Sequence, residues 1–468
     1  MSASSPKPAG TLAAGPTQQL ATFVSELRFD ALPPEVVEKA KTCLLDSLGC
    51  CLFGSTLPWT RMVADTILEQ GGQPHACLLG TKHRTSVTQA VLVNSTAGHA
   101  FELDDAHTRA SMHVGSVSFP VALALSQWPG NLSGREFIAA TVAGYEAGLR
   151  VGIAADGHIF KRGFHPAAVC GVFSSAATAS RALGLDSDQT RNALGIAGSQ
   201  ASGLMAAQEG AMVKRLHTGR AAQSGLYSAL LARRGFTGIA DVLEAPFGGF
   251  FDAVSEDWVP GHLTAGLGHA WEILKVGFKP YATAGASHAS LLALDEIMLE
   301  GRLTAADIAA IDVRCTTYCF KHVAWPYEPR GVAAAQLNLF FALAAMAVDR
   351  AALIAQFAED RLADPRLLAF MPKIHVQPDP ELDALGHAHR YAMIMTVRTM
   401  DGRTFRRESR DRPGSPGRAL TRQQLVDKFR LLAASVLPDE TIEQVISTVS
   451  ALDRLETTAA LSDLLVPA

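Results

Sequence analysis

Residues 98–120, GHAFELDDAHTRASMHVGSVSFP, hold three carboxylates and three histidines between two apolar segments that are typical of helices. These six residues are Glu102, Asp104, Asp105, His99, His107 and His113. Carboxylates and imidazoles are the side chains that most often carry protons near neutral pH. The stretch therefore predicts an acid–base site in a loop between two helices, and later basic clusters complement it.

Apolar residues at three- and four-residue spacings predict helices through most of the chain from Gln18 to about Pro260. One helix is expected to open at Pro33-Pro34, because proline suits the first turn. Further helices are expected at 58–70, 86–99, 116–128, 134–154, 166–183, 188–204 and 219–234. Small residues are concentrated in GVFSSAATASRALG (171–184) and GIAGSQASGLMAA (195–207), so we expect these helices to pack closely.

The pattern changes near residue 270, where short segments rich in valine, isoleucine and threonine predict strands. The expected strands are 311–317, 372–378 and 391–399, and Asp401-Gly402 predicts a hairpin turn into a further strand. Helices are expected at 287–300, 332–357, 421–436 and 438–450. We therefore expect a mainly α fold, in which a large all-helical domain (1–269 and 411–468) is interrupted by a smaller α+β domain (270–410).

Composition excludes several classes of protein. The chain has 468 residues, of which 48% are hydrophobic, and a formal net charge of −4, so neither nucleic acid nor a membrane is expected as a partner. The first residues lack the apolar core of a signal peptide, and the seven scattered cysteines indicate no disulfide framework. Both observations favour a cytoplasmic protein. The sequence has no phosphate-binding glycine loop, no GxSxG and no HExxH.

Three basic clusters follow the acidic stretch: KRGFHP (161–166), MVKRLHTGR (212–220) and LKVGFKPY (274–281). Each cluster alone fits a solvated surface. Lys214 follows an apolar pair, however, and Lys279 stands between Phe278 and Pro280, so partial burial is expected to lower their pKa values. If the clusters converge on residues 98–120, they form a pocket for a small anionic polycarboxylate, held by cations while a proton is moved.

The residues expected to carry catalysis are separate from those expected to bind substrate. The catalytic candidates are Asp104, His113, His165, Lys214, Lys279 and Tyr145. The candidates for substrate binding are Asp105, His107, Lys161, Arg215 and His217. The acids and histidines of the loop could also hold a divalent cation, but such a set serves acid–base work as readily, and we expect no metal.

The chain resembles the MmgE/PrpD family. The matching segments are LLDSLGCCLFGS (44–55), GHAFELDDAH (98–107), HVGS (113–116), GYEAGLRVG (144–152), GFHP (163–166), GSQASGLM (198–205), MVKRLHTGRAAQSG (212–225), GFTG (235–238), FKPY (278–281) and RPGSPGRALTRQQLVDKF (412–429). The resemblance implies a helical domain of discontinuous sequence, a smaller α/β lid domain, a homodimer, and a cofactor-free site between the domains. Matched residue by residue, that site holds Asp104 or Asp105, His113, His165, Lys214 and Lys279, with Tyr145 as a weaker candidate.

The resemblance implies proton removal next to a carboxylate, but it leaves three functions open. Ala106 replaces the family's usual threonine, Thr218 replaces its usual proline, and Asn338 and Phe341 replace a frequent serine and tyrosine. A hydroxyl missing at two places would favour an epimerase, such as an iminodisuccinate epimerase, because epimerisation expels no hydroxide. The alternatives are a lyase of the 2-methylcitrate dehydratase or cis-aconitate decarboxylase type, and a binding protein that has lost catalysis.

Overall fold

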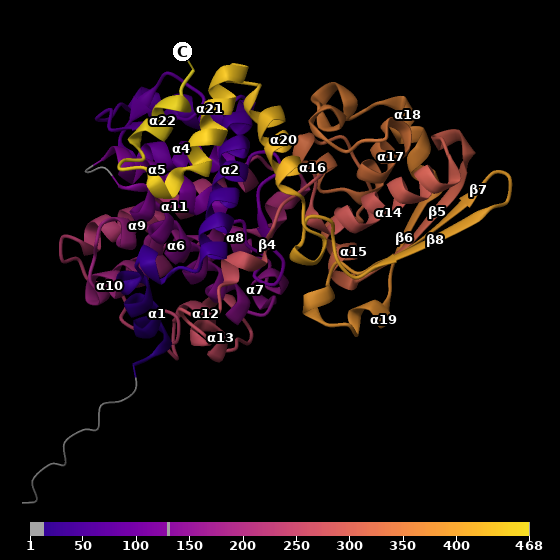
Figure 1. The fold of residues 1–468 in the computed structure, drawn as a ribbon. Coiled ribbons are helices and arrows are strands. Elements are labelled where there is room, and N and C mark those ends of the chain that lie inside the picture. The colour runs from indigo at the N-terminus through magenta and orange to yellow at the C-terminus, as the bar shows by residue number, and fades with distance from the viewer. Residues whose placement is uncertain (1–13, 129–131, 468) are drawn as a thin grey trace, which may run out of the picture.

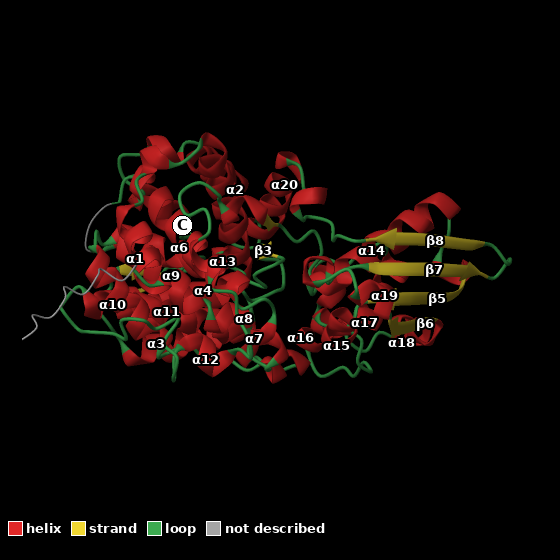
Figure 2. Ribbon diagram, turned by 90° about the horizontal axis from the view of Figure 1, so that it is seen from below, coloured by secondary structure: helices red, strands yellow, loops and turns green. Residues whose placement is uncertain are grey.

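The chain folds into two lobes in the computed structural model, which describes residues 14–128 and 132–467 (Figure 1). The larger lobe is helical and contains both the first and the last helices of the chain. The four-stranded sheet lies in the smaller lobe, at the far end from those helices (Figure 2). The expected mainly helical fold is confirmed, whereas a movement of the smaller lobe as a lid stays a prediction.

The helical lobe is built from segments at both ends of the chain. Its helices are α1 (Pro16–Glu26), α2 (Pro34–Ser55), α3 (Pro58–Gln70), α4 (Val87–Gly98), α5 (Gly115–Gln127), α6 (Gly134–Ala154), α7 (His158–Lys161), α8 (Pro166–Val169), α9 (Gly171–Ala182), α10 (Ser187–Gly198), α11 (Val213–Ala232), α12 (Phe250–Val254), α13 (Gly261–Thr264), α20 (Arg422–Ala433), α21 (Asp439–Ser450) and α22 (Ala459–Leu464). Two small antiparallel sheets pair β1 (Ala76–Cys77) with β2 (Arg84–Thr85), and β3 (Ala106–His107) with β4 (Val276–Gly277).

The central helix of this lobe is α6, whose residues are buried except for Arg135 and Glu136. It begins with a capping box, in which Ser133 accepts from the backbone of Glu136 and the Glu136 side chain accepts from that of Ser133. It is long and apolar enough to cross a membrane, but the whole of its apolar stretch is buried in the lobe. A helix that is apolar on all sides is typical of such a core position.

Small residues let the central helices approach closely, as expected. A Cβ atom at Gly144 of α6 would lie 1.9 Å from Oγ1 of Thr178 in α9. On the other side of α9, a Cβ at Gly225 of α11 would lie 2.4 Å from the Cβ of Ser175. Any larger side chain at either glycine would push the helices apart. Helix α11, which carries the second basic cluster, is thereby held against the middle of the lobe.

The smaller lobe is a four-stranded sheet with helices packed on it. Its elements are α14 (Gly285–Gly301), β5 (Ile308–Cys315), α15 (Thr317–Val323), α16 (Val332–Gln336), α17 (Leu339–Asp349), α18 (Pro365–Phe370), β6 (Ile374–Pro378), α19 (Pro380–Asp383), β7 (Met393–Thr399) and β8 (Thr404–Ser409). The strand order is β6-β5-β7-β8, in which only β5 and β6 are parallel. The β7–β8 hairpin turns at Asp401-Gly402, where Gly402 has a φ of 89°.

Buried apolar side chains form two separate cores. The first runs from Leu20 to Phe278 and is completed by residues 425–465, so the last helices return to the helical lobe. The second core lies mainly between Ala282 and Met395 and includes the inner faces of β5 and β7. The chain crosses between the lobes near residues 279–285 and 410–420, which places those two segments next to each other.

Three expected helices are shorter than the sequence predicts. The helix expected at 332–357 breaks into α16 and α17, because Asn338 caps α17 by accepting from the backbone N–H of Phe341 at 3.0 Å. The one expected at 166–183 breaks at Cys170. The one expected at 188–204 ends at Gly198, since the following residues run beside the 164–165 segment, where Gly203 accepts from the backbone of His165.

Candidate active site

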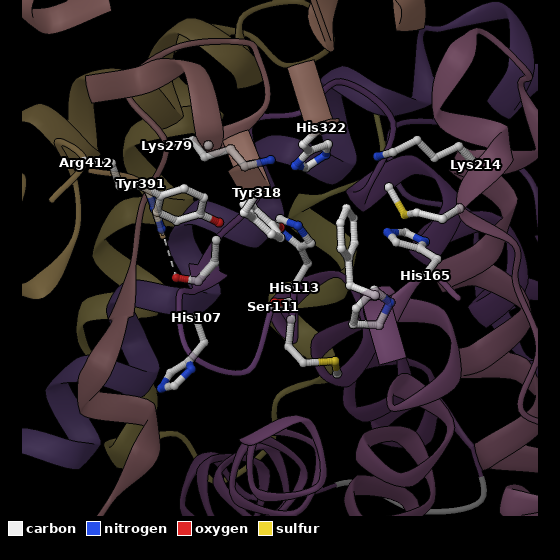
Figure 3. Close-up of a pocket in the computed structure, with 16 residues that line it drawn as sticks. His107, Ser111, His113, His165, Lys214, Lys279, Tyr318, His322, Tyr391 and Arg412 are labelled. Atoms are coloured by element: carbon white, nitrogen blue, oxygen red, sulfur yellow. Dashed lines mark hydrogen bonds between the residues drawn. The ribbon is translucent and has the colours of Figure 1, made fainter. Parts of the chain in front are cut away.

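A cavity of about 60 Å³ lies between the two lobes, and we call it the inner cavity (Figure 3). From the helical lobe and the connection that leaves it, the inner cavity is lined by His107, Ser111, His113, His165, Lys214 and Lys279. From the smaller lobe it is lined by Gly285, Tyr318, His322 and Tyr391, and from the segment that returns to the helical lobe it is lined by Arg412. The cavity is therefore polar, and it combines imidazoles, ammonium groups, phenols and a guanidinium.

The loop between α4 and α5 brings the acidic stretch to this cavity. Its strand β3 pairs with β4, so that Ala106 lies opposite Gly277. That pairing carries Lys279, two residues further on, to the carboxylates of the loop. Glu102, within the loop, has a φ of 57°, a left-handed conformation that a non-glycine residue adopts only when its surroundings hold it. Its side chain is the centre of the charge network below.

Three buried cations converge on the carboxylate of Glu102. The Lys214 ammonium contacts its Oε1, Nη1 of Arg215 donates to the same oxygen at 2.6 Å, and Nζ of Lys279 donates to Oε2 at 2.9 Å. Burial alone would raise the pKa of Glu102, but the three cations hold it well below its usual range. Burial also lowers the pKa of Lys214 to about 8, although Glu102 acts in the opposite direction.

His113 is held as a neutral imidazole with a defined tautomer. Its Nδ1 lies 2.7 Å from the backbone oxygen of Asp105, which can only accept, so Nδ1 carries the proton and Nε2 keeps a lone pair. Burial lowers the pKa of His113 to about 3, against the opposing effect of Asp104, whose Oδ2 is 3.5 Å from Nδ1. A neutral imidazole with a free Nε2 can accept a proton.

The imidazoles of His165 and His217 extend the polar surface on the helical side of the inner cavity. Nδ1 of His165 lies 3.1 Å from Nδ1 of His217, so one of the two nitrogens donates to the other. Burial holds the pKa of His165 well below its usual range and lowers that of His217 to about 4. The ring of His99 lies between those of His113 and His165, at centroid distances of 5.1 and 5.5 Å. The imidazoles thus form a continuous row.

The carboxylate of Asp104 contacts this row of imidazoles from outside the inner cavity. Its Oδ2 lies 2.7 Å from Nδ1 of His99, and its Oδ1 lies 3.5 Å from Nζ of Lys279. Burial would raise the pKa of Asp104, but the ammonium of Lys279 and the hydrogen bond from His99 hold it well below the usual range. Asp104 is thus an ionised, buried carboxylate that orients imidazoles and does not itself line the inner cavity.

The candidate atoms of His99, Asp104 and His113 lie within 4.8 Å of one another, close enough to hold a cation. The hydrogen bond between His99 and Asp104 already uses two of these three candidate groups, and the ammonium of Lys279 lies beside it. A positive neighbour opposes a cation, so these contacts fit acid–base work better than metal binding.

Most of the other sequence candidates lie outside the inner cavity, and only His107 among them lines it. Asp105 accepts from the Tyr145 hydroxyl at 2.6 Å and from the backbone N–H of Gly115, and neither Asp105 nor Tyr145 lines the cavity. Burial raises the pKa of Asp105 to about 7. Arg215 also lies behind the cavity, where it donates to the carboxylate of Glu102 and, from Nη2 at 2.8 Å, to Oε1 of Gln336. His107 does line it, with its Nε2 3.4 Å from Glu272.

Lys161 is exposed and belongs to a second, wider pocket of about 670 Å³, which we call the outer pocket. Lys321 and Arg390 line the outer pocket too. Three side chains, Phe160, Met205 and Tyr318, line both spaces, so they separate the outer pocket from the inner cavity. The outer pocket therefore adjoins the inner cavity, and its lining holds three cationic side chains and the carboxylate of Asp383.

Several cavity residues were not among the sequence candidates. Tyr318 and His322 stand four residues apart on α15 and so share one face of that helix, which is a signal that the sequence did offer. Arg412 belongs to the quoted RPGSPG motif, but no local pattern distinguishes it from a loop arginine. Of the replacements that favoured an epimerase, Ala106 lines the inner cavity, whereas Asn338 and Phe341 do not, and Asn338 donates to the backbone oxygen of Trp325.

Known proteins match the chain along nearly its whole length. The MmgE/PrpD N-terminal domain matches residues 18–261, and the MmgE/PrpD C-terminal domain matches residues 281–453. The cis-aconitate decarboxylase-like protein oryM of Aspergillus oryzae is 32% identical, over 96% of each chain. The cis-aconitate decarboxylase of Aspergillus terreus is 30% identical over 96% of each chain. The 2-methylcitrate dehydratase of Cupriavidus necator is 26% identical, over 94% of this chain and 95% of its own. The chain therefore belongs to the MmgE/PrpD family of enzymes, and these relatives are lyases by name.

Proposed function

We propose that this protein is a lyase of a small polycarboxylic acid, and that it removes carbon dioxide from cis-aconitate or a close analogue. The observation that carries the proposal is the inner cavity, where neutral imidazoles and buried ammonium groups meet between the lobes. Similarity to decarboxylases over almost the entire chain supports this choice of reaction.

The proposed reaction requires a proton donor and a way to hold several negative charges. When an unsaturated tricarboxylate loses carbon dioxide, the bond to the leaving carboxyl carbon breaks and its electron pair forms a new double bond. The old double bond shifts and takes up one proton at its far carbon. Lys214, with a pKa of about 8, is mostly protonated at neutral pH and is our candidate for the donor.

We assign the remaining roles from the contacts around the cavity. His113 and His165 face the substrate as neutral imidazoles, and Lys279 neutralises charge next to them. Asp104 positions these groups from behind the cavity surface. Tyr145, expected as a catalytic candidate, contacts Asp105 and not the cavity, so we assign it a positioning role.

Dehydration is the second candidate function, because one relative is a 2-methylcitrate dehydratase. It needs the same proton carriers and an acid for the departing hydroxide. The relatives do not support the epimerisation that the sequence favoured. Epimerisation would need only a proton removed from one face and returned on the other. The homodimer, the cytoplasmic location and the absence of a cofactor stay predictions.

One incubation series in deuterated water separates these reactions. The purified protein is offered cis-aconitate and, separately, 2-methylcitrate and chiral dicarboxylates, and the products are followed by carbon dioxide release and proton NMR. We expect one carbon dioxide per cis-aconitate consumed and one deuterium in the product. Alkene formation from 2-methylcitrate with no carbon dioxide would favour the dehydratase, and deuterium exchange without net conversion would favour an epimerase. No reaction at all would contradict the proposal.

A further inference from the structure

The guanidinium of Arg412 is buried beside the inner cavity without a counter-charge. Arg412 is 1% exposed, and its Nη2 donates to the backbone oxygen of Ala106 at 3.1 Å (Figure 3). Its Nε and Nη1 are buried and have no hydrogen-bond partner in the part of the chain that the structure describes. Burying an unpaired charge is costly. The cost is offset when an anionic ligand provides the missing acceptors.

The N-terminus of α14 lies next to this guanidinium. Ala284, which precedes the helix, offers no side-chain cap, so the first-turn amides have no side-chain acceptor there. Gly285, the first residue, lines the inner cavity. A Cβ atom at Gly285 would lie 3.5 Å from Cδ of Arg412, 3.6 Å from its Nε and 3.7 Å from the Tyr391 hydroxyl. The missing side chain therefore leaves room between a helix N-terminus and a guanidinium, and both attract anions.

The hydroxyl of Tyr391 completes the same corner. It accepts a hydrogen bond from Nη2 of Arg390 at 3.1 Å, so its own proton is free to be donated. The guanidinium of Arg390 also lies 4.6 Å from the centre of the Tyr391 ring, which fixes the ring in place. A carboxylate in this corner would meet the guanidinium of Arg412, a phenol and helix amides, while the carboxylates of Asp411 and Asp105 act on Arg412 from a longer range.

We propose that Arg412, the α14 N-terminus at Gly285 and the Tyr391 hydroxyl form a binding site for one carboxylate of a small polycarboxylate substrate. This inference rests on the proposed function and adds which carboxylate is held. Carbon dioxide is neutral, so a cation that grips the departing carboxylate stabilises the starting state more than the transition state. Arg412 therefore holds a carboxylate that stays in the product, and the departing one faces the neutral imidazoles of His113 and His165.

The test measures binding without turnover. Propane-1,2,3-tricarboxylate has no double bond to shift, and its affinity is measured by titration calorimetry for the wild type, Arg412→Met and Gly285→Ala. We expect about 10- to 100-fold weaker binding in Arg412→Met, the usual worth of a hydrogen-bonded charge. Gly285→Ala should weaken binding while folding normally, since its Cβ meets no atom closer than 3.5 Å. Arg418→Met, an exposed arginine of the same segment, is the control and should bind as the wild type does.

A thermal melt separates a binding role from a structural one. Because Arg412 is an unpaired buried charge, Arg412→Met should keep or raise the melting temperature while affinity falls. Wild-type affinity in both Arg412→Met and Gly285→Ala would overturn the binding site and leave the proposed function standing. If the wild type neither bound the tricarboxylate nor converted cis-aconitate, both proposals would fall. Gly285→Ala keeps the test decisive should Arg412→Met fold poorly.

Discussion

The three buried cations on the helical side of the inner cavity share one carboxylate, that of Glu102, whereas Arg412, in the segment that connects the lobes, pairs with no carboxylate of the described residues. A paired cation is already satisfied and contributes to stability and to the electrostatics of its neighbours. An unpaired buried cation contributes to binding when an anion arrives. We therefore expect the groups around Glu102 to serve proton transfer and Arg412 to hold a carboxylate.

The largest effect is expected for His113, a neutral imidazole that lines the inner cavity. Replacing His113 by asparagine keeps size and some hydrogen bonding, so kcat should fall by about 10²- to 10⁴-fold with little change in KM. His375→Asn, at an exposed position of β6, is the matched control and should keep full activity. Full activity of His113→Asn with a lowered melting temperature would show that this histidine has a structural role and takes no part in catalysis.

Removing the shared carboxylate should expose the difference between paired and unpaired cations directly. In Glu102→Gln the three cations lose the carboxylate that they share, and we expect the free energy of unfolding to fall by about 3–5 kcal/mol. Urea unfolding measures it, with Glu328→Gln, an exposed partner of Arg330, expected to change it by about 0.5 kcal/mol or less. Equal stability of Glu102→Gln and Glu328→Gln would mean that the helical-side cations do not depend on Glu102.

The pH dependence of turnover sharpens the role of Lys214. If its ammonium form donates the proton, kcat should be constant below pH 8 and fall as the pH rises through about 8. Glu102 raises the pKa of Lys214, so removing that charge in Glu102→Gln should move the fall to lower pH. Rate profiles of the two proteins provide the comparison, and an unchanged alkaline fall in Glu102→Gln would show that another group causes it.

The smallest effect is expected from removing metal ions. His99 and Asp104 bond to each other beside the ammonium of Lys279, so the group of candidate ligands is better suited to protons than to a cation. Exhaustive dialysis against a chelator should leave turnover unchanged. Loss of activity that one divalent ion restores would instead identify the His99, Asp104 and His113 group as a metal site.

The sequence by itself determined the helical lobe and much of the lining of the inner cavity that comes from residues 98–120. Apolar spacing located α3, α4 and α6 within about one residue of their bounds, because buried helices must present apolar residues on a regular period. Residues 98–120 predicted an acid–base loop between two helices, and the loop lines the cavity with His107 and His113. Glu102 and His99 belonged to that stretch, but nothing local showed that one gathers cations and the other orients Asp104.

Only the tertiary structure decided what lies across the cavity. Gly285, Tyr391 and Arg412 come from segments more than a hundred residues apart at their extremes, and each is unremarkable in its own sequence context. Their meaning arises from distance and burial, since an arginine becomes a carboxylate site only when folding removes it from water without a partner. The same reason placed Lys161 in the outer pocket and Tyr145 behind Asp105. Sequence spacing fixes which face of a helix a side chain occupies, whereas the packing of distant segments fixes what that face meets.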